Sequence, residues 1–238
     1  MSFNETIARY REFDFVRAAE RASARDVERA LAKRHLDEED LLALLSPAAA
    51  PFLEQMAVRS SETTLMHFGR VIHLYAPLYI SNFCVNECAY CGFRHSTGIP
   101  RMKLTMEEIE VEARAIAATG IRHILVLTGE SRRDSPVSYI RDAVNILEKH
   151  FSSISIEVYP LELEEYRALV EAGADGLTLY QETYDEALYD SIHRGPKRNY
   201  LNRLEAPERA CEARMRTVGV GALLGLSDWR RDSFLAAL

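Results

Sequence analysis

The sequence LYISNFCVNECAYCGF, residues 78–93, joins an apolar, strand-like run to a loop that holds three of the four cysteines of the chain. These cysteines are Cys84, Cys88 and Cys91. Asn86 and Gly92 favour a loop over a helix. Iron–sulfur clusters normally take four cysteine ligands, so three thiolates leave one iron of a four-iron cluster open to a small chelating molecule. The stretch therefore predicts a reactive iron–sulfur site at the end of a strand.

Other interpretations of these cysteines stay open. Their spacing can also place them on one side of a buried helix, because free cysteine packs as a small hydrophobic residue. His95 follows closely enough to be the fourth ligand of a zinc site. Disulfides are not expected, because nothing in the sequence marks secretion. The remaining cysteine, Cys211, falls within a predicted helix, where we expect it in the core.

From residue 71 onward, strand-like and helix-like segments alternate. The expected strands are 71–83, 123–128, 154–159, 176–180 and 218–226, and the expected helices are 105–119, 136–149, 162–172, 206–215 and a last one from about 228. Thr105 and Glu108 have the spacing of a capping box, and Pro207 is expected in the first turn of its helix. Such alternation predicts parallel strands with crossover helices, in a doubly wound sheet or a barrel.

Polar residues follow most of the expected strands, which favours a TIM-type barrel with its functional groups at the carboxyl ends of the strands. The cysteine loop, Glu130, Glu182 and Asp228 are examples. Residues 71–238 hold about five strand–helix units, whereas a complete eight-unit barrel takes roughly 250 residues. The predicted fold class is therefore α/β, an incomplete TIM-type (β/α) barrel of about five of eight units, truncated on its C-terminal side. We expect this chain alone to be inactive and prone to self-association at its last strand.

Residues 1–70 are expected to form a helical N-terminal arm. Leucines between positions 36 and 45 recur with a helical period. The acidic run 37–40 is expected in the first turn of that helix, where the helix dipole favours negative charge. A break at 46–51 precedes another expected helix, which runs from Pro51 to His67. We therefore predict two domains, residues 1–70 and 71–238.

Composition limits the partners. The net charge of −7 argues against general nucleic-acid binding. No apolar run approaches the roughly 20 residues of a membrane span, and Asn4, Glu5 and Arg9 interrupt any signal-peptide core. We expect a cytoplasmic protein with neither nucleic acid nor membrane as partner, in a compartment that keeps thiols reduced.

The spacing C-x3-C-x2-C, with an aromatic residue before the last cysteine, resembles the radical S-adenosylmethionine (SAM) superfamily. The resemblance implies a [4Fe–4S] cluster on Cys84, Cys88 and Cys91, with the open iron chelated by the amino and carboxylate groups of SAM. It places Tyr90 near the adenine. An electron from the cluster then cleaves SAM to a 5′-deoxyadenosyl radical, which implies an external electron donor of the flavodoxin or ferredoxin type.

Two further stretches carry the resemblance. LTGE, residues 127–130, resembles the Gly-Gly-Glu motif of the superfamily, in which Glu130 accepts a hydrogen bond from the SAM amino group; a carboxylate suits such a donor. YQETY, residues 180–184, resembles the segment that binds the ribose hydroxyls, and Gln181 and Thr183 match by position. Glu182 is expected to point to the other face, because strand side chains alternate.

Arg203 resembles the arginine that pairs with the SAM carboxylate, and it is expected just before a helix. A planar guanidinium suits a carboxylate, although a surface ion pair with Glu205 or Glu208 is the alternative. GVGALLGLSD, residues 219–228, resembles the G-x-I-x-G-x-x-E stretch near adenine but departs from it at the aliphatic and acidic positions. The basic segment 193–198 is expected to be a solvated connector or an element that closes over substrate.

Together, CVNECAYCGF, LTGE, YQETY, RLEAPERA and GALLGLSDWR resemble the tyrosine-cleaving branch of the superfamily. The branch that serves thiamine synthesis cleaves the Cα–Cβ bond of L-tyrosine to 2-iminoacetate and 4-cresol, and implies thiazole synthase as a partner. The sister tyrosine lyases that mature iron-only hydrogenase carry the same motifs. A non-catalytic iron–sulfur carrier is the alternative from another class, but a carrier does not need Glu130 and Arg203. The sequence does not identify the residues that bind tyrosine.

Overall fold

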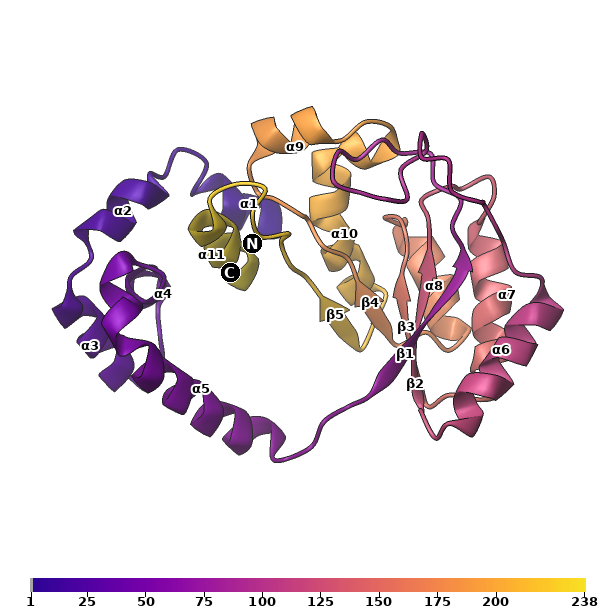
Figure 1. The fold of residues 1–238 in the computed structure, drawn as a ribbon, viewed down its shortest axis with the longest axis horizontal. Coiled ribbons are helices and arrows are strands. Elements are labelled where there is room, and N and C mark those ends of the chain that lie inside the picture. Colours follow the sequence, from indigo (N-terminus) through magenta and orange to yellow (C-terminus); the bar gives the residue numbers. More distant parts are fainter. Residues whose placement is uncertain (1) are drawn as a thin grey trace. The chain divides into compact units, whose positions relative to one another are not determined.

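The computed structural model describes residues 2–238 and divides into two compact units. The sheet unit contains the first few residues up to Glu5 and residues 73–223; the helical unit contains residues 6–72 and 224–238. Both can be followed in Figure 1, in which the colours run along the chain. The expected domain division at residue 70 lies near the passage from helical unit to sheet unit. The expected division into two domains, residues 1–70 and 71–238, stays a prediction.

The sheet unit is built on five parallel strands in the order β1-β2-β3-β4-β5. Their bounds are Tyr75–Ser81 for β1, His123–Thr128 for β2, Ser153–Glu157 for β3, Gly176–Thr178 for β4 and Thr217–Gly219 for β5. Each strand pairs with the next one along the chain, so the sheet has no point at which the strand order reverses. A doubly wound sheet has such a reversal, whereas a (β/α) barrel adds its strands in sequence. The topology is that of part of a barrel.

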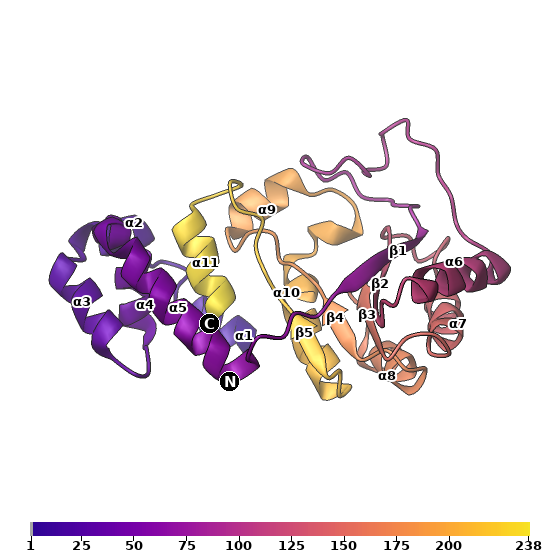
Figure 2. The same cartoon turned by 60° about the horizontal axis from the view of Figure 1, so that its bottom comes forward.

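Helices connect the strands and lie against the sheet in chain order. They are α6 (Met106–Ala118), α7 (Val137–Leu147), α8 (Leu163–Glu171) and α10 (Tyr200–Glu212). Helix α6 packs on α7, α7 on α8 and α8 on α10, and Figure 2 shows the first three side by side. Because each helix contacts its neighbour, they form a continuous layer, as the outer layer of a barrel does.

Side chains along β3 point alternately to the helix-covered core and to the opposite face of the sheet. Ile154 and Ile156 are buried against the helices, together with Ile140 and Leu169. Each fully buried side chain of this kind contributes roughly 1.5–3 kcal/mol relative to exposure. Glu157, the last residue of β3, follows Ile156 and therefore points to the opposite face.

Local signals fix the ends of several helices. Thr105 and Glu108 form the predicted capping box at the start of α6: each side chain accepts a hydrogen bond from the backbone of the other, at 3.2 and 2.7 Å. Substituting such a cap typically costs about 1 kcal/mol. The capping box of Asp37 and Asp40 likewise starts α4 (Glu38–Leu44) in the helical unit and accounts for the predicted acidic first turn.

The segment between β4 and β5 differs from expectation. Helix α10 begins at Tyr200 rather than at Ala206, because the Asn199 side chain caps it by accepting from the Asn202 N–H at 3.1 Å. Pro207 therefore lies inside the helix instead of in its first turn. Helix α9 (Glu186–Ile192) and the short 3-10 helix η2 (Pro196–Arg198) were not predicted. Strand β5 is shorter than expected, although a single bridge between Glu182 and Ala222 continues the pairing.

The helical unit packs short helices around aromatic rings. Its elements are α2 (Phe15–Arg21), α3 (Ala24–Ala32), α4, the 3-10 helix η1 (Pro47–Phe52), α5 (Leu53–Phe68) and α11 (Trp229–Ala237), and α1 (Phe3–Ala8) begins in the sheet unit. The Phe234 ring on α11 lies 5.1 Å from Tyr10 and 5.4 Å from Phe15. These edge-on contacts bring the end of the chain into the N-terminal helices.

No single helix among residues 2–238 has the length and apolar composition to cross a membrane. Helix α4 and the segment Pro47–Phe68 reach the required length and apolar composition only when they are counted together, and the chain bends by 78° between them.

Candidate functional site

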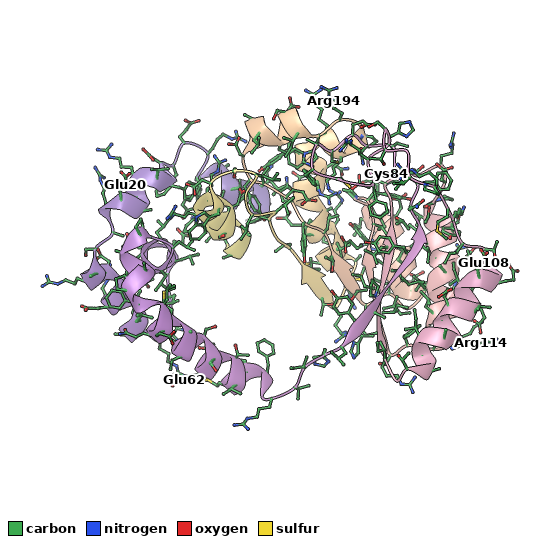
Figure 3. The ribbon with its side chains drawn as sticks, viewed as in Figure 1. Glu20, Glu62, Cys84, Glu108, Arg114 and Arg194 are labelled. Atoms are coloured by element: carbon green, nitrogen blue, oxygen red, sulfur yellow. The ribbon has the colours of Figure 1, made fainter. Side chains whose placement is uncertain are left out.

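A cavity of about 220 Å³ lies at the carboxyl ends of β1, β2 and β3. Its polar lining includes Cys84, Cys88, Cys91, Glu130, Glu182 and Arg203. Figure 3 labels Cys84 and Arg194, which both lie at the end of the sheet unit where β1 terminates. The structure therefore brings together the three predicted cluster cysteines and, because Tyr90 also lines the cavity, three of the five predicted SAM contacts. It does so at the edge of the sheet where barrel enzymes carry their active sites.

The cysteine side chains form one wall of this cavity as free thiols. Cys88 is buried, and burial raises the pKa of its thiol to about 11, against the opposing effect of the Lys197 charge. A thiol in such surroundings loses its proton when it binds a metal. The expectation that Cys211 is a core residue is wrong: it is exposed on α10.

The loop after β2 brings Glu130 beside the cysteine loop. The Gly129 N–H donates to the Ser81 carbonyl at 2.9 Å, and the Val85 N–H donates to the Glu130 carbonyl at 3.1 Å. A Cβ atom at Gly129 would lie 2.3 Å from the Phe83 carbonyl oxygen. Position 129 therefore requires glycine, because any side chain would push the two loops apart.

Arg203 pairs with Glu130 rather than with an acid on the surface. Its guanidinium lies 2.8 Å from the Glu130 carboxylate and donates to the Tyr180 carbonyl at 2.7 Å, and only 8 % of its side chain is exposed. The alternative ion pair with Glu205 or Glu208 is not formed. Arg203 stands in the first turn of α10, not ahead of a helix as predicted, because the helix begins at Tyr200.

Glu182 also faces the cavity, against the expectation that it points to the other face. Strand β4 ends at Thr178, and Glu182 has a backbone φ of 76°, so strand alternation no longer applies at this position. Its carboxylate accepts from the Lys197 ammonium at 2.7 Å. With only 13 % and 11 % of their side chains exposed, these two residues form a second partly desolvated ion pair in the cavity.

The basic segment 193–198 is a solvated connector only in part. His193 is fully buried, and the N–H groups of Glu87 and Ala89 in the cysteine loop donate to carbonyls of Arg194 and Ile192 at 3.1 and 3.0 Å. The other residues of the segment are exposed, apart from the partly buried Lys197, and Arg198 forms an exposed ion pair with Asp190. The segment thus supports the cysteine loop from behind.

Tyr90 is held by His193. The His193 Nδ1 lies 2.9 Å from the Tyr189 carbonyl oxygen, which only accepts, so Nδ1 carries the hydrogen. The Nε2 atom then accepts from the Tyr90 hydroxyl at 2.7 Å. Burial, reinforced by the Lys197 charge, lowers the pKa of His193 to about 4. Burial, followed by the Glu182 charge, raises the pKa of Tyr90.

The proposed ribose contacts lie outside the cavity lining. Gln181 and Thr183 are buried, and the Gln181 amide lies 3.4 Å from the Tyr200 carbonyl oxygen, to which it donates. Asp228 belongs to the helical unit, where it caps α11 by accepting from the Arg230 N–H at 3.0 Å. Glu130, Tyr90 and Arg203 are thus brought together in the cavity, whereas Gln181 and Thr183 do not line it.

Glu157 is a site residue that sequence reasoning missed. It lines the cavity, and burial, followed by the Glu182 charge, raises the pKa of its carboxyl. The signal was present: an acidic residue ends β3, directly after the buried Ile156, and alternation turns it away from the helices. With Glu130 and Glu182 it makes three carboxylates facing two cations, Lys197 and Arg203.

The donor set fits a cluster better than a single ion. A mononuclear zinc site requires at least three protein ligands around one metal position. Within residues 2–238, no three His, Cys, Asp or Glu side chains are grouped in this way. A four-iron cluster instead spreads its thiolates over separate irons, and cysteine thiolate is its usual ligand. With Cys211 exposed elsewhere, three thiolates line this cavity and would leave one iron for another ligand.

Comparison with known proteins agrees with the assignment of the three cysteines to an iron–sulfur cluster. The model of the family described as "Radical SAM superfamily" matches residues 78–238. The chain is 45 % identical over 217 residues to 2-iminoacetate synthase of Salmonella typhimurium, covering 90 % of this chain and 58 % of that protein. The Escherichia coli 2-iminoacetate synthase gives the same figures. The chain therefore spans somewhat more than half the length of these curated relatives.

Solved structures show the same fold. HydG, a maturase of the [FeFe]-hydrogenase, superimposes with a TM-score of 0.86 at 31 % identity over 97 % of this chain and 52 % of that chain. Methylornithine synthase (PylB) gives 0.73 at 25 % identity over 89 % of this chain and 62 % of that chain. The predicted α/β fold, part of a TIM-type barrel, is confirmed. The chain belongs to the radical SAM superfamily, whose members use a [4Fe–4S] cluster and S-adenosylmethionine.

Proposed function

We propose that this chain is the radical SAM portion of a lyase that cleaves the Cα–Cβ bond of L-tyrosine to 2-iminoacetate and 4-cresol, for the thiazole part of thiamine. The observation that carries the proposal is the 45 % identity to 2-iminoacetate synthases over 90 % of the chain. The similarity to 3-methylornithine synthase of Methanosarcina acetivorans is lower, at 30 % over 180 residues. Because one fold serves different substrates in these relatives, the substrate assignment rests on that difference in identity.

The proposal gives five of the cavity residues a direct task. Cys84, Cys88 and Cys91 would hold the cluster. Glu130 would accept from the amino group of SAM, and Arg203 would donate to its carboxylate, since both side chains reach the cavity. When bound, the cluster and SAM supply the hydrogen-abstracting radical.

The remaining assignments are less direct. Tyr90 would lie near adenine, because its ring lines the cavity and its hydroxyl is fixed by His193. For Gln181 and Thr183, contact with the ribose would require them to become accessible from the cavity. The protein would need an external electron donor of the flavodoxin or ferredoxin type and would pass its product to thiazole synthase. A cytoplasmic location suits these reduced thiols.

A second candidate function is tyrosine cleavage for hydrogenase maturation. The observation that favours it is the superposition on HydG with a TM-score of 0.86. Its identity of 31 % is lower than the 45 % to 2-iminoacetate synthase, and we place it second for that reason. A non-catalytic iron–sulfur carrier is disfavoured by the Glu130–Arg203 pair, because a carrier gains nothing from two desolvated charges beside its cluster.

The test assays two polypeptides after anaerobic reconstitution with iron and sulfide. One is the 238-residue chain. In the other, these residues replace the matching portion of the Salmonella 2-iminoacetate synthase, because the chain covers 58 % of that enzyme. With SAM, reductant and L-tyrosine, the second should release 5′-deoxyadenosine, 4-cresol and glyoxylate from hydrolysed 2-iminoacetate. We expect little or no turnover from the first.

A Cys88→Ala version of the second polypeptide is the control and should release none of these products. Carbon monoxide and cyanide among the products would move the assignment to hydrogenase maturation. Formation of 5′-deoxyadenosine that does not depend on tyrosine would contradict both tyrosine-lyase assignments.

A further inference from the structure

Asn86 lies between Cys84 and Cys88, and only 1 % of it is exposed. Its side-chain amide is used at both ends. The Nδ2 atom donates to Glu130 Oε2 at 2.8 Å, and the Oδ1 atom accepts from the Lys197 N–H at 2.9 Å. One side chain of the cysteine loop thus connects that loop to the segment after β2 and to the segment after α9.

The orientation of this amide is determined by its partners. The backbone N–H of Lys197 can only donate, so the oxygen of Asn86 must face it and the NH₂ group must face Glu130. The chain closes tightly around the amide at Gly195, which has a φ of +87°, and a Cβ atom there would lie 2.7 Å from Oδ1. Glycine is needed at that position because it adopts this backbone conformation at little cost.

Glu130 is consequently held at both oxygens. Arg203 donates to Oε1 and Asn86 donates to Oε2, each at 2.8 Å. Two donors from different elements, α10 and the cysteine loop, fix the plane of the carboxylate. An ionised carboxylate has about four acceptor positions, so acceptor capacity remains for a ligand in the cavity that Glu130 lines.

We propose that Asn86 is a positioning residue that orients Glu130 for the amino group of SAM. This proposal rests on the role proposed above for Glu130 as the contact of the SAM amino group. Because Asn86 lies in the loop that carries Cys84 and Cys88, it ties the direction of the carboxylate to the placement of the cluster ligands. Asn86 acts through Glu130 and contributes to SAM affinity only while that carboxylate is present.

The informative substitution is Asn86→Asp. An aspartate has the same shape and still accepts from the Lys197 N–H, but it loses the donor to Glu130 and places a like charge against it. The dissociation constant of SAM, measured by equilibrium binding to the reconstituted chain, should rise about tenfold to a hundredfold, as expected for losing a hydrogen bond to a charged group. The iron content should stay at the unmodified level.

The double variant with Glu130→Gln separates positioning from general damage. If Asn86 acts through Glu130, Asn86→Asp should change SAM affinity by less than about twofold in the Glu130→Gln background, a non-additive result typical of residues in contact. In that background the aspartate can accept from the glutamine amide, so the hydrogen bond is restored with its direction reversed.

Asn82→Asp is the matched control for charge. Asn82 lines the same cavity, and both ends of its amide are used, by Pro100 and Met102, but it does not contact Glu130. Its substitution adds the same negative charge and should change SAM affinity by less than about threefold.

Each contrary outcome has a separate meaning. An equal loss of affinity for Asn86→Asp in both backgrounds, loss of iron in Asn86→Asp, or an equal effect of Asn82→Asp would overturn the positioning role while leaving Glu130 as the SAM contact. If Glu130→Gln alone leaves SAM affinity unchanged, or if the unmodified reconstituted chain binds no SAM, both the site assignment and the role of Asn86 are overturned.

Discussion

Arg203 and Glu130 are 73 positions apart in the chain, yet their side chains form an ion pair of 2.8 Å in the cavity. The two residues were predicted to contact opposite charges of one ligand, the amino and carboxylate groups of SAM. In the structure each neutralises the other. A zwitterionic ligand could share both, because its ammonium suits the carboxylate and its carboxylate suits the guanidinium. The pair is thus ready for such a ligand without leaving an uncompensated charge in its absence.

Arg203→Met should destabilise the chain and weaken SAM binding. Removing one partner of a buried ion pair costs roughly 3–5 kcal/mol, because the other charge stays desolvated. Glu130 keeps its bond to Asn86, so we expect the lower end of that range. SAM affinity should fall about tenfold to a hundredfold. Chemical unfolding and equilibrium SAM binding measure the two effects.

Arg198→Met is the control for this prediction. Arg198 pairs with Asp190 on the surface, with more than half of each side chain exposed. Solvent screens such pairs, so the unfolding midpoint and SAM affinity should stay unchanged. Equal effects of the two arginine variants would contradict the importance of the buried pair.

Local sequence signals predicted much of the fold. The strand at residues 123–128 and the capping box of Thr105 and Glu108 match the structure, because each depends on residues close together in sequence. The start of α10 was missed because Pro207 suggests a helix N-terminus, whereas Asn199 caps the helix eight positions earlier. Both residues are typical of helix N-termini, and the structure shows that the Asn199 cap marks the start of this helix.

The site was harder to predict where it depends on contacts between distant segments. The three cysteines were found from their spacing. The contacts of His193 and Lys197 were missed, because they join distant segments: His193 contacts Tyr90, and the Lys197 N–H donates to Asn86. Glu182 was assigned to the wrong face because its positive φ ends the alternation of the strand.

Cys84→Ala, Cys88→Ala and Cys91→Ala should each lower the iron bound after anaerobic reconstitution and weaken the visible charge-transfer absorbance of the cluster. All three side chains line one cavity, and thiolates are the usual ligands of such clusters. Cys211→Ala is the control, because Cys211 is exposed on α10, and it should bind iron like the unmodified chain. Full iron content in a variant lacking all three loop cysteines would show that the cluster lies elsewhere.

His193 should make the chain less stable in acid. Burial, reinforced by the Lys197 charge, lowers its pKa to about 4 in the folded chain, against about 6.5 when unfolded. Between these values the unfolded state binds more protons, so stability rises with pH. The contribution is fully present above pH 6.5 and is lost as pH falls toward 4. Allowing for solvent screening, it amounts to roughly 2 kcal/mol.

His193→Gln should remove this pH dependence, and chemical unfolding at a series of pH values measures it. The glutamine amide can still accept from Tyr90 and donate to the Tyr189 carbonyl, the two contacts that His193 makes, but it does not titrate. His67→Gln on α5 is the control, because His67 is exposed. An unchanged pH slope in His193→Gln would show that other groups cause the acid sensitivity.

The 238-residue chain should associate with itself through the edge of β1 rather than through the last strand, as first expected, because β5 spans only Thr217–Gly219 whereas β1 spans Tyr75–Ser81. Within residues 2–238, β1 pairs along its length with β2, and its last residue, Ser81, also forms a bridge with Lys103. Tyr75, the first residue of β1, is 61 % exposed, and Leu74, which precedes it, is 68 % exposed. An exposed apolar edge strand offers unpaired backbone groups to another chain. Sedimentation velocity should therefore show larger species as protein concentration rises.

Introducing charge at that edge should reduce the association. Lysine is a residue that natural edge strands use to prevent pairing, so Leu74→Lys with Tyr75→Lys should shift the distribution toward monomer. Val111→Lys is the matched control: Val111 lies on α6, away from the edge, and is 64 % exposed. If the unmodified chain stays monomeric at all concentrations, or if Val111→Lys reduces association as strongly, the edge of β1 does not drive it.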